Sequence, residues 1–385
     1  MSTIRLGDFI TEITEKTIVN NQYRVLTSSQ DGIVSQDEYF NKHVASKDTT
    51  GYKIIRKGQF TYRAMSDTGR FYINQLSDYD IGIVSPAYPI FEIKDNYILY
   101  PAFLQSFFRS DYFQSLIANQ SWGSTRVSLK LDIIKKIEIY LPPLEIQHQI
   151  VENLDKVTHL IDLCNQILDK LDLLVKSRFV EMFGDTESNS NGFPTYKLSS
   201  LCAVSSSKRI YQDEQSSSGV PFLRISNLVE LIESGYFNSD LFIPEGKYHE
   251  LLENDLVPKA GDILVTSRGT LGKCYIVQKN DKFYFQDGMI SWLYDIDSSI
   301  TPLYLTLLFD TRDIKRQIEN LQSGSTVAYL SIAMLKKLNI VVPPITLQEQ
   351  FAAFVEQTDK SKLAVKKVLE KAETLKKALM QEYFG

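Results

Sequence analysis

The longest regular pattern of apolar positions lies in residues 144–184, where hydrophobic side chains recur at alternating intervals of four and three residues. These positions are Ile150, Leu154, Val157, Ile161, Cys164, Leu168, Leu171 and Val175. The spacing predicts a long α-helix whose apolar row, here called the seam, packs against another helix as in a coiled coil. The apolar face is widened by Leu160, Leu163, Ile167 and Leu174, so we expect it to contact more than one neighbour.

A weaker version of this pattern occupies residues 345–385. The spacing is kept by Phe351, Val355, Val365, Leu369 and Ala372, but Lys362 and Lys376 occupy two seam positions. About 38 helical residues, each rising about 1.5 Å, would extend over about 57 Å. The simplest arrangement of two such helices is an antiparallel pair. Two ordinary long core helices are the alternative that periodicity alone leaves open.

The two patterns are copies of one segment, because residues 141–184 and 342–385 align without a gap. The offset is 201 residues, the difference between positions 142 and 343. Identical residues at this offset are Pro142-Pro143 and Pro343-Pro344, Gln147 and Gln348, Gln149 and Gln350, and Phe183-Gly184 and Phe384-Gly385. A fixed long period indicates a duplicated architecture, so we expect two complete halves related by a pseudo-two-fold axis. The paired prolines suit the start of a helix, where a missing N–H costs least.

The part of each half that precedes the helix is predicted to be mainly β. In residues 1–143, short apolar and aromatic runs at 52–55, 60–62, 71–73, 81–84 and 89–93 are separated by Gly, Asp, Asn and Ser. Helices are predicted at 103–117 and 130–136, and a last strand at 137–141.

The second half repeats this pattern after a polar segment, 185–194, that we interpret as a linker. Gly58 corresponds to Gly261, and Arg70 to Lys273. The expected fold class is therefore α+β, with two mainly β domains, each followed by a long helix. The predicted organisation is a first domain at 1–143, a helix at 144–184, the linker at 185–194, a second domain at 195–344 and a helix at 345–385.

Composition places the chain among globular proteins. It has 385 residues, 43% of them hydrophobic and 23% charged, which is enough for two or three domains. No apolar run has the length of a membrane span, and the N-terminus lacks the apolar core of a signal peptide. The scattered Cys164, Cys202 and Cys274 suggest reduced thiols in a cytosolic protein.

The charge distribution is more informative than the net charge. A net charge of −5 argues mildly against nucleic-acid binding. However, each half contains one basic tract, at 42–75 and at 258–282. A solvated charged face is the alternative for either tract alone, and their recurrence at matched positions favours a shared role.

Catalytic motifs are largely missing. Residues 269–273 are too short for a P-loop, no Gly-x-Gly-x-x-Gly opens a helix, and His43, His148, His159 and His249 are far apart in the sequence. The spacing of Asp240, Glu245 and Lys247 fits a loose metal-dependent nuclease pattern, for which a turn at Pro244-Glu245-Gly246 is the simpler explanation. The sequence therefore predicts no enzymatic activity.

Candidate nucleic-acid contacts are cations beside glycine and hydroxyl side chains. Arg268, with Ser267, follows the predicted strand 262–266 in a glycine-containing turn, from which an arginine could fork to a guanine edge or to phosphate, or form a local ion pair. Arg70 and Lys273 each follow a glycine and suit a phosphate contact. Lys208 and Arg209 lie in a serine-rich loop. The set is completed by Arg63, Arg224, Ser124, Thr125, Arg126, Ser325 and Thr326. The matched Gly-Ser-Thr triplets at 123–125 and 324–326 could alternatively be tight turns or helix caps.

The chain resembles the DNA-specificity subunit of type I restriction-modification systems. The resemblance rests on the alternation of variable domain and conserved helix, on LPPLEIQHQIV at 141–151 and VPPITLQEQF at 342–351, and on GDILVTSRGTLGK at 261–273 and FQDGMISWL at 285–293. The first domain is more divergent, with Met65 where Arg268 would align.

The resemblance implies a function without catalysis. Each domain would bind one half of a bipartite site on double-stranded DNA, and the helices would set the unread spacer. The partners would be two methyltransferase subunits, which use S-adenosylmethionine and dock on the helices, and two ATP- and Mg-dependent translocase-nuclease subunits. The chain itself would need no cofactor or metal and would work in the bacterial cytoplasm without a membrane. A coiled-coil scaffold with two protein- or glycan-binding domains is the alternative.

Overall fold

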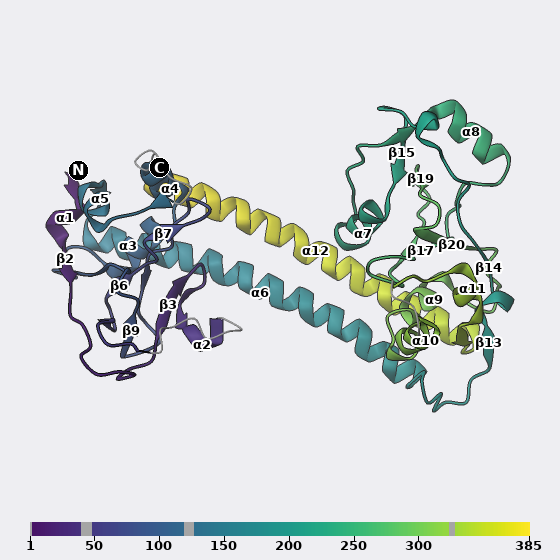
Figure 1. The fold of residues 1–385 in the computed structure, drawn as a ribbon, viewed down its shortest axis with the longest axis horizontal. Helices are drawn as coiled ribbons and strands as arrows, with labels where there is room; N and C mark the ends of the chain where they lie inside the picture. The colour runs from purple at the N-terminus through teal and green to yellow at the C-terminus, as the bar shows by residue number, and fades with distance from the viewer. Residues whose placement is uncertain (1, 40–47, 119–126, 323–327) are drawn as a thin grey trace. The chain divides into compact units, whose positions relative to one another are not determined.

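The computed structural model describes residues 2–39, 48–118, 127–322 and 328–385, and Figure 1 gives the order of their elements. Two compact units are present, one formed by residues 1–167 with 364–385 and the other by residues 168–363. Each unit contains a β-rich domain together with segments of two long helices. The predicted α+β class is confirmed. Among the described residues, no helix combines the length and the apolar character needed to cross a bilayer.

The first unit is built from short antiparallel strands. Its largest sheet has the order β2 (Ile10–Ile13), β10 (Ile90–Ile93), β6 (Phe60–Thr61) and β8 (Asn74–Gln75). Four strand pairs surround it: β1 (Ser2–Arg5) with β12 (Glu138–Leu141), β3 (Leu26–Ser29) with β4 (Gly32–Ser35), β5 (Lys53–Arg56) with β9 (Ile81–Val84), and β7 (Met65–Ser66) with β11 (Val127–Ser128). The short helices are α1 (Leu6–Phe9), α2 (Gln36–Tyr39), α3 (Pro101–Phe108), α4 (Asp111–Ala118) and α5 (Leu131–Lys136).

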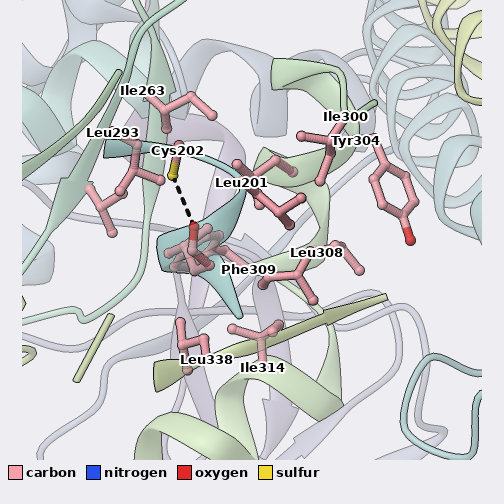
Figure 2. Close-up of a cluster of buried hydrophobic side chains, with 14 of the residues drawn as sticks. Leu201, Cys202, Ile263, Leu293, Ile300, Tyr304, Leu308, Phe309, Ile314 and Leu338 are labelled. Carbon is pink, nitrogen blue, oxygen red and sulfur yellow. Dashed lines mark hydrogen bonds between the residues drawn. The ribbon is translucent and has the colours of Figure 1, made fainter. Parts of the chain in front are cut away.

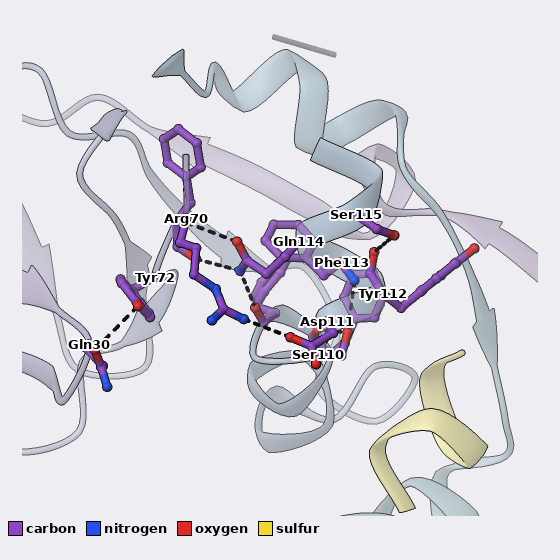
Figure 3. Close-up of polar contacts among 12 residues, drawn as sticks. Gln30, Arg70, Tyr72, Ser110, Asp111, Tyr112, Phe113, Gln114 and Ser115 are labelled. Carbon is purple, nitrogen blue, oxygen red and sulfur yellow. Dashed lines mark hydrogen bonds and ion pairs between the residues drawn. The ribbon is translucent and has the colours of Figure 1, made fainter. Parts of the chain in front are cut away.

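Two predictions for this domain were wrong. The single helix predicted at 103–117 is two helices, because the buried Ser110 caps the second one. Its hydroxyl donates to the carbonyl of Phe107 (2.7 Å) and accepts from the N–H of Phe113 (3.0 Å). Residues 71–73 form no strand. The side chain of Gln114, labelled in Figure 3, instead takes the place of a neighbouring strand, accepting from the N–H of Phe71 (3.1 Å) and donating to its carbonyl (2.9 Å).

The second unit repeats the four-stranded sheet and adds a separate three-stranded sheet. A four-stranded sheet has the order β14 (Ala203–Ser205), β20 (Ile290–Tyr294), β17 (Ile263–Thr266) and β18 (Cys274–Ile276). β13 (Thr195–Lys197) pairs with β21 (Asn339–Val341), and a three-stranded sheet has the order β16 (Phe242–Ile243), β15 (Val220–Leu223) and β19 (Tyr284–Phe285). The helices are η1 (Leu198–Ser200), η2 (Gln212–Glu214), α7 (Ile225–Ser234), α8 (Glu245–Glu253), α9 (Pro302–Leu308), α10 (Arg312–Gln322) and α11 (Ile332–Lys337). Pro244-Glu245-Gly246 is therefore the start of α8, not the isolated turn predicted from the sequence.

The duplication is visible in individual backbone hydrogen bonds. The N–H of Leu6 donates to Ile137, and that of Leu198 donates to Leu338, both at 2.9 Å. Gly58 and Gly261 have φ angles of 90° and 94°, a region that suits glycine, and open equivalent turns. The domains differ mainly in what is inserted. Residues 26–39 form β3, β4 and α2 in the first domain, whereas residues 220–253 form β15, β16, α7 and α8 in the second.

The two long helices, α6 (Leu144–Phe183) and α12 (Ile345–Phe384), lie antiparallel within each unit. In the first unit, the Nδ2 of Asn153 donates to the hydroxyl of Tyr383 at 3.2 Å. In the second unit, the rings of Phe183 and Phe351 pack with their centroids 5.3 Å apart. The seam lysine Lys362 forms an ion pair of 2.7 Å with Asp172, so its charge does not enter the seam unpaired.

The seam residues are mostly buried, whereas the widened face is not. Fully buried members are Ile150, Leu154, Val157, Cys164, Val175, Phe351, Val355 and Ala372, and half-buried members are Ile161, Leu168, Leu171, Val365 and Leu369. By contrast, three of the four residues that widen this face, Leu160, Leu163 and Leu174, are 39%, 43% and 48% exposed, and the fourth, Ile167, is half-buried. An apolar face of this kind is therefore left uncovered on α6.

The helices are part of the domain cores. In the second unit, Phe179 and Phe183 pack against Tyr304 and join a cluster that includes Ile263, Leu293, Phe309 and Leu338 (Figure 2). Cys202 lies in the same cluster, and burial raises the pKa of its thiol to about 12, so the thiol stays protonated. Phe384 plays the matching part in the first unit, where it packs against Phe103 and Phe107. All three cysteines are free thiols.

Candidate nucleic-acid interface

Arg268 emerges from the end of the buried strand β17. The preceding residue, Ser267, is held on both sides, because its N–H donates to Met289 and its carbonyl accepts from Leu330, both at 2.9 Å. The hydroxyl of Ser267 lies 2.7 Å from the hydroxyl of Ser291. Ser267 as a whole is only 2% exposed, so its side chain belongs to the core. Gly269, with a φ of 66°, then turns the chain. Arg268 is thereby exposed on a rigid base, and Ser267 drops out of the candidate surface.

The guanidinium of Arg268 stacks on Tyr329. Its Cζ lies 5.0 Å from the ring centroid, and the two backbones form an isolated antiparallel bridge. The local ion pair considered as an alternative is not formed with any described residue. Stacking on an aromatic ring limits the rotamers of an arginine while leaving its N–H groups free for a ligand. Tyr329 was missed by sequence reasoning, because it lies 61 residues away from Arg268 in the chain.

The matched cations Arg70 and Lys273 each face a carboxylate, although the two carboxylates come from different elements. The Nη2 of Arg70 lies 2.8 Å from Asp111 at the start of α4, and Figure 3 shows the guanidinium turned toward this carboxylate. The Nζ of Lys273 forms an ion pair with Glu233 at the end of α7. Such partly exposed ion pairs are weak, so a phosphate group could replace either carboxylate at little cost. Both residues remain candidates for phosphate contacts.

Lys208 and Arg209 project from an anchored loop. The hydroxyl of the buried Tyr284 accepts from the N–H of Lys208 (2.8 Å) and donates to its carbonyl (3.2 Å). Burial raises the pKa of Tyr284 to about 12, so the phenol keeps the proton that this second bond requires. The exposed cations lie near carboxylates, Lys208 at 3.8 Å from Glu250 and Arg209 at 2.8 Å from Asp287. The hydrogen bond to Asp287 raises the pKa of Arg209 further.

Arg224 is half-buried just before α7. Its N–H donates to the side chain of Asn227 at 3.0 Å, and its Nη2 forms an ion pair with Asp240. This ion pair also bears on the nuclease hypothesis, which required Asp240, Glu245 and Lys247 to act together. Glu245 instead pairs with Lys282 at 2.9 Å.

Lys247 lies between two carboxylates, at 2.9 Å from Glu214 and 3.2 Å from Glu250. The hydrogen bond to Glu214 raises its pKa, so it stays protonated. No group of three potential metal ligands occurs among the described residues. The three residues of the nuclease pattern are thus held in separate ion pairs and form no nuclease site. His148, His159 and His249 are exposed on helices.

Some candidates lie outside the described residues. These are His43, Ser124, Thr125, Arg126, Ser325 and Thr326. Arg63 is described and exposed, and it forms neither an ion pair nor a side-chain hydrogen bond with any described residue. It lines a cavity of about 170 Å³ together with Met65, Arg70 and Tyr72.

The repeated glutamines Gln147 and Gln348 have a structural role that could not be predicted from the sequence. Gln147 is fully buried and bonds three backbone groups: its Nε2 donates to Ile98 and Pro142 (both 2.9 Å), and its Oε1 accepts from Tyr100 (2.8 Å). Gln348 repeats this arrangement with Ser299 (2.9 Å), Pro343 (2.8 Å) and Thr301 (2.8 Å). Each glutamine therefore locks the first turn of a long helix to its domain. The ungapped repeat did show that Gln147 and Gln348 are identical, but the helical periodicity gave no reason for that identity.

Together these features define a class of protein, a duplicated protein with two α+β domains of one fold. Each domain presents exposed cations near the ends of strands, and the part of the chain that the structure describes contains no group of three potential metal ligands. Residues 1–173 and 191–376 match the family model of the type I restriction modification DNA specificity domain, so the chain belongs to this family and contains its domain twice. The resemblance inferred from the motifs is confirmed.

Individual relatives agree with the family match. The chain is 25% identical over 240 residues to a putative type I restriction enzyme specificity subunit of Haemophilus influenzae, covering 61% of this chain and 59% of the relative. It is 26% identical over 279 residues to the MjaIX specificity subunit of Methanocaldococcus jannaschii, covering 66% and 61%. The alignments thus span about three fifths of the length of these curated relatives.

Solved structures share the fold at lower identity. One is a chain from a study of the assembly and conformational transition of the type I R-M system, with a TM-score of 0.63, 18% identity and coverage of 99% of this chain and 97% of that one. Another is the type I restriction-modification S subunit of M. genitalium, with a TM-score of 0.56, 15% identity and coverage of 100% and 96%.

Proposed function

We propose that this chain is the DNA-recognition subunit of a type I restriction-modification complex and is itself non-catalytic. The observation that carries the proposal is that the specificity-domain family matches the chain twice, once for each β-rich domain with its helix. Each domain, 1–143 and 195–344, binds one half of a bipartite site on double-stranded DNA. The second domain contributes Arg268 to a base edge, and Arg70 and Lys273 contact phosphates.

The long helices set the spacer and dock the partners. A pair of methyltransferase subunits, which bring S-adenosylmethionine, covers the exposed leucines Leu160, Leu163 and Leu174 of α6. An exposed apolar row of this kind favours a protein partner. Two translocase-nuclease subunits add ATP- and Mg-dependent chemistry. The net charge of −5 is consistent with partners that supply much of the positive DNA clamp.

The first test is methylome mapping in cells that express this chain with its methyltransferase partner. We expect a new N6-methyladenine motif made of two short blocks around a fixed gap. If the complex assembled but no motif appeared, the proposal would be refuted, and the protein- or glycan-binding scaffold would take its place. Salt-dependent, sequence-selective binding of duplex DNA by the complex separates the same two functions directly.

The spacer function needs its own experiment. Inserting four residues, about one helical turn, into both α6 and α12 lengthens the paired helices. The methylated motif should then keep both half-sites and gain base pairs in the gap. A variant that is methylated at the original motif with an unchanged gap would show that the helices do not set the spacing.

A further inference from the structure

The two domains can be aligned residue by residue through equivalent backbone hydrogen bonds at the strand end that carries Arg268 in the second domain. The N–H of Leu129 donates to the carbonyl of Ala64 at 2.9 Å, and the N–H of Leu330 donates to that of Ser267, also at 2.9 Å. The next residue of each strand pairs across in the same way, Met65 with Ser128 and Arg268 with Tyr329. Met65 therefore occupies the backbone position of Arg268.

This correspondence leaves the first domain without either member of the stacked pair. Met65 cannot donate a hydrogen bond, and Ser128 cannot support a guanidinium as Tyr329 does. The loss of both residues together shows that the first domain does not use the arrangement of the second. A direct base contact in the first domain must then come from another donor on the same face.

Arg63 is on that face. Arg63 and Met65 lie on either side of a bend at Ala64, and both side chains are exposed. Both residues line the cavity of about 170 Å³ described above.

The ion pairs distinguish Arg63 from the other cations. Seven cationic candidates lie among the described residues, and five of them are paired with a carboxylate: Arg70, Lys208, Arg209, Arg224 and Lys273. The two without an ion pair to any described residue are Arg63 and Arg268, one in each domain. An unpaired, exposed guanidinium offers its fork of donors without first having to give up a carboxylate.

We propose that Arg63 is the base-reading residue of the first domain, displaced by two residues from the position that Arg268 occupies in the second. It donates its two parallel N–H groups to the O6 and N7 atoms of a guanine in the major groove. Met65 forms the apolar wall beside it, and Arg70, held by Asp111, contacts phosphate. This inference rests on the proposed function and names the residue that determines specificity in one half-site.

The experiment uses the full chain assembled with its methyltransferase partner and a library of duplexes with randomised positions. Selection and sequencing give the base preference at every position for the wild type, Arg63→Ala, Arg63→Lys, Arg70→Ala and Arg268→Ala. We expect Arg63→Ala to lose about 5- to 150-fold of the preference for guanine at one position. Arg63→Lys should keep the overall affinity, because it keeps the charge, and should lose only part of the preference, because an ammonium keeps donors for guanine but lacks the planar fork.

The control variants distinguish a base contact by Arg63 from a general loss of DNA affinity. Arg70→Ala should weaken binding to all sequences without relaxing any position. Arg268→Ala should relax a position on the opposite side of the gap from the one that Arg63→Ala relaxes. Since Arg63 is exposed and unbonded, the unfolding midpoint of Arg63→Ala should equal that of the wild type, so lost preference cannot come from misfolding.

Two failures are separable. If the wild-type complex selected no sequence at all, the proposed function would fall, and this inference with it. If the wild type selected a bipartite sequence and Arg63→Ala kept the wild-type preference at every position, the inference alone would be overturned.

Discussion

Replacing Gln348 by leucine tests whether the repeated glutamines attach the long helices to their domains. Leucine has a similar volume, so Gln348→Leu removes hydrogen bonds without opening a large cavity. Three backbone groups lose their partner: the carbonyls of Ser299 and Pro343, and the N–H of Thr301.

The expected loss follows from the positions of these groups. A buried polar group left without a hydrogen bond costs about 1–3 kcal/mol. The carbonyl of Pro343 is in the buried part of the site, whereas Ser299 is exposed and Thr301 half-buried, so water can satisfy those two groups in part. We therefore expect Gln348→Leu to lower the free energy of unfolding of the second unit by about 2–4 kcal/mol.

Urea unfolding followed by circular dichroism measures this loss. The matched control is Gln350→Leu, which changes a repeated but exposed glutamine in the same helical turn and should stay within about 0.5 kcal/mol of the wild type. Gln147→Leu should destabilise the first unit by a similar amount, since Gln147 makes the same three bonds. If Gln348→Leu were as stable as Gln350→Leu, the hydrogen-bonding argument would be refuted.

Three further changes test the packing, the electrostatics and the proposed DNA contacts. Phe183→Ala removes a ring that packs against Phe179, Tyr304 and Phe351, and should cost about 3–5 kcal/mol in a urea titration; a loss below 1 kcal/mol would contradict the packing. Burial raises the pKa of the Asp262 carboxyl above its usual 3.8. The folded state therefore binds a proton at this carboxyl more tightly than the unfolded state does. As a result, the free energy of unfolding falls as pH rises through the raised pKa. Asp262→Asn, which keeps an acceptor for Trp292, should therefore gain stability over the wild type between pH 4 and neutrality, and thermal melts showing a pH-independent difference would refute this. Lys273→Ala should weaken binding of every duplex and reduce the slope of log affinity against log salt by about 1; a change confined to particular sequences would assign it to base readout instead.

The pairing of cations with carboxylates bears on how such domains change their targets. In both domains the proposed phosphate contacts, Arg70 and Lys273, are matched in position and in having an acidic partner. The proposed base contacts are not matched, because Arg268 stacks on Tyr329 while Met65 faces Ser128. A constant phosphate contact beside a variable base contact would let one fold acquire new sequences without losing its affinity for DNA.

Much of this protein could be predicted from local patterns, because the physical signals involved are short-range. The seam from Ile150 to Val175 depends on helical periodicity alone, and the two halves depend on a repeat without gaps. The mainly β character of the domains follows from short apolar runs between turn residues. The family followed from the motifs, and the matches to both halves confirm it.

The remaining features depend on contacts between residues that are far apart in the chain. Gln114 supplies, from 43 residues away, the bonds that a strand at 71–73 would have needed. Ser110 is a local exception, because its hydroxyl bonds residues only three positions away and so divides the predicted helix. Ser267 and Arg268 are neighbours, and the sequence made both candidates for DNA contact. In the structure, Ser267 is buried with its hydroxyl bonded to that of Ser291, whereas Arg268 is exposed and stacks on Tyr329. Which side of a strand is buried, and which cation is left unpaired, are decided by the packing of the whole domain, and no local pattern contains that information.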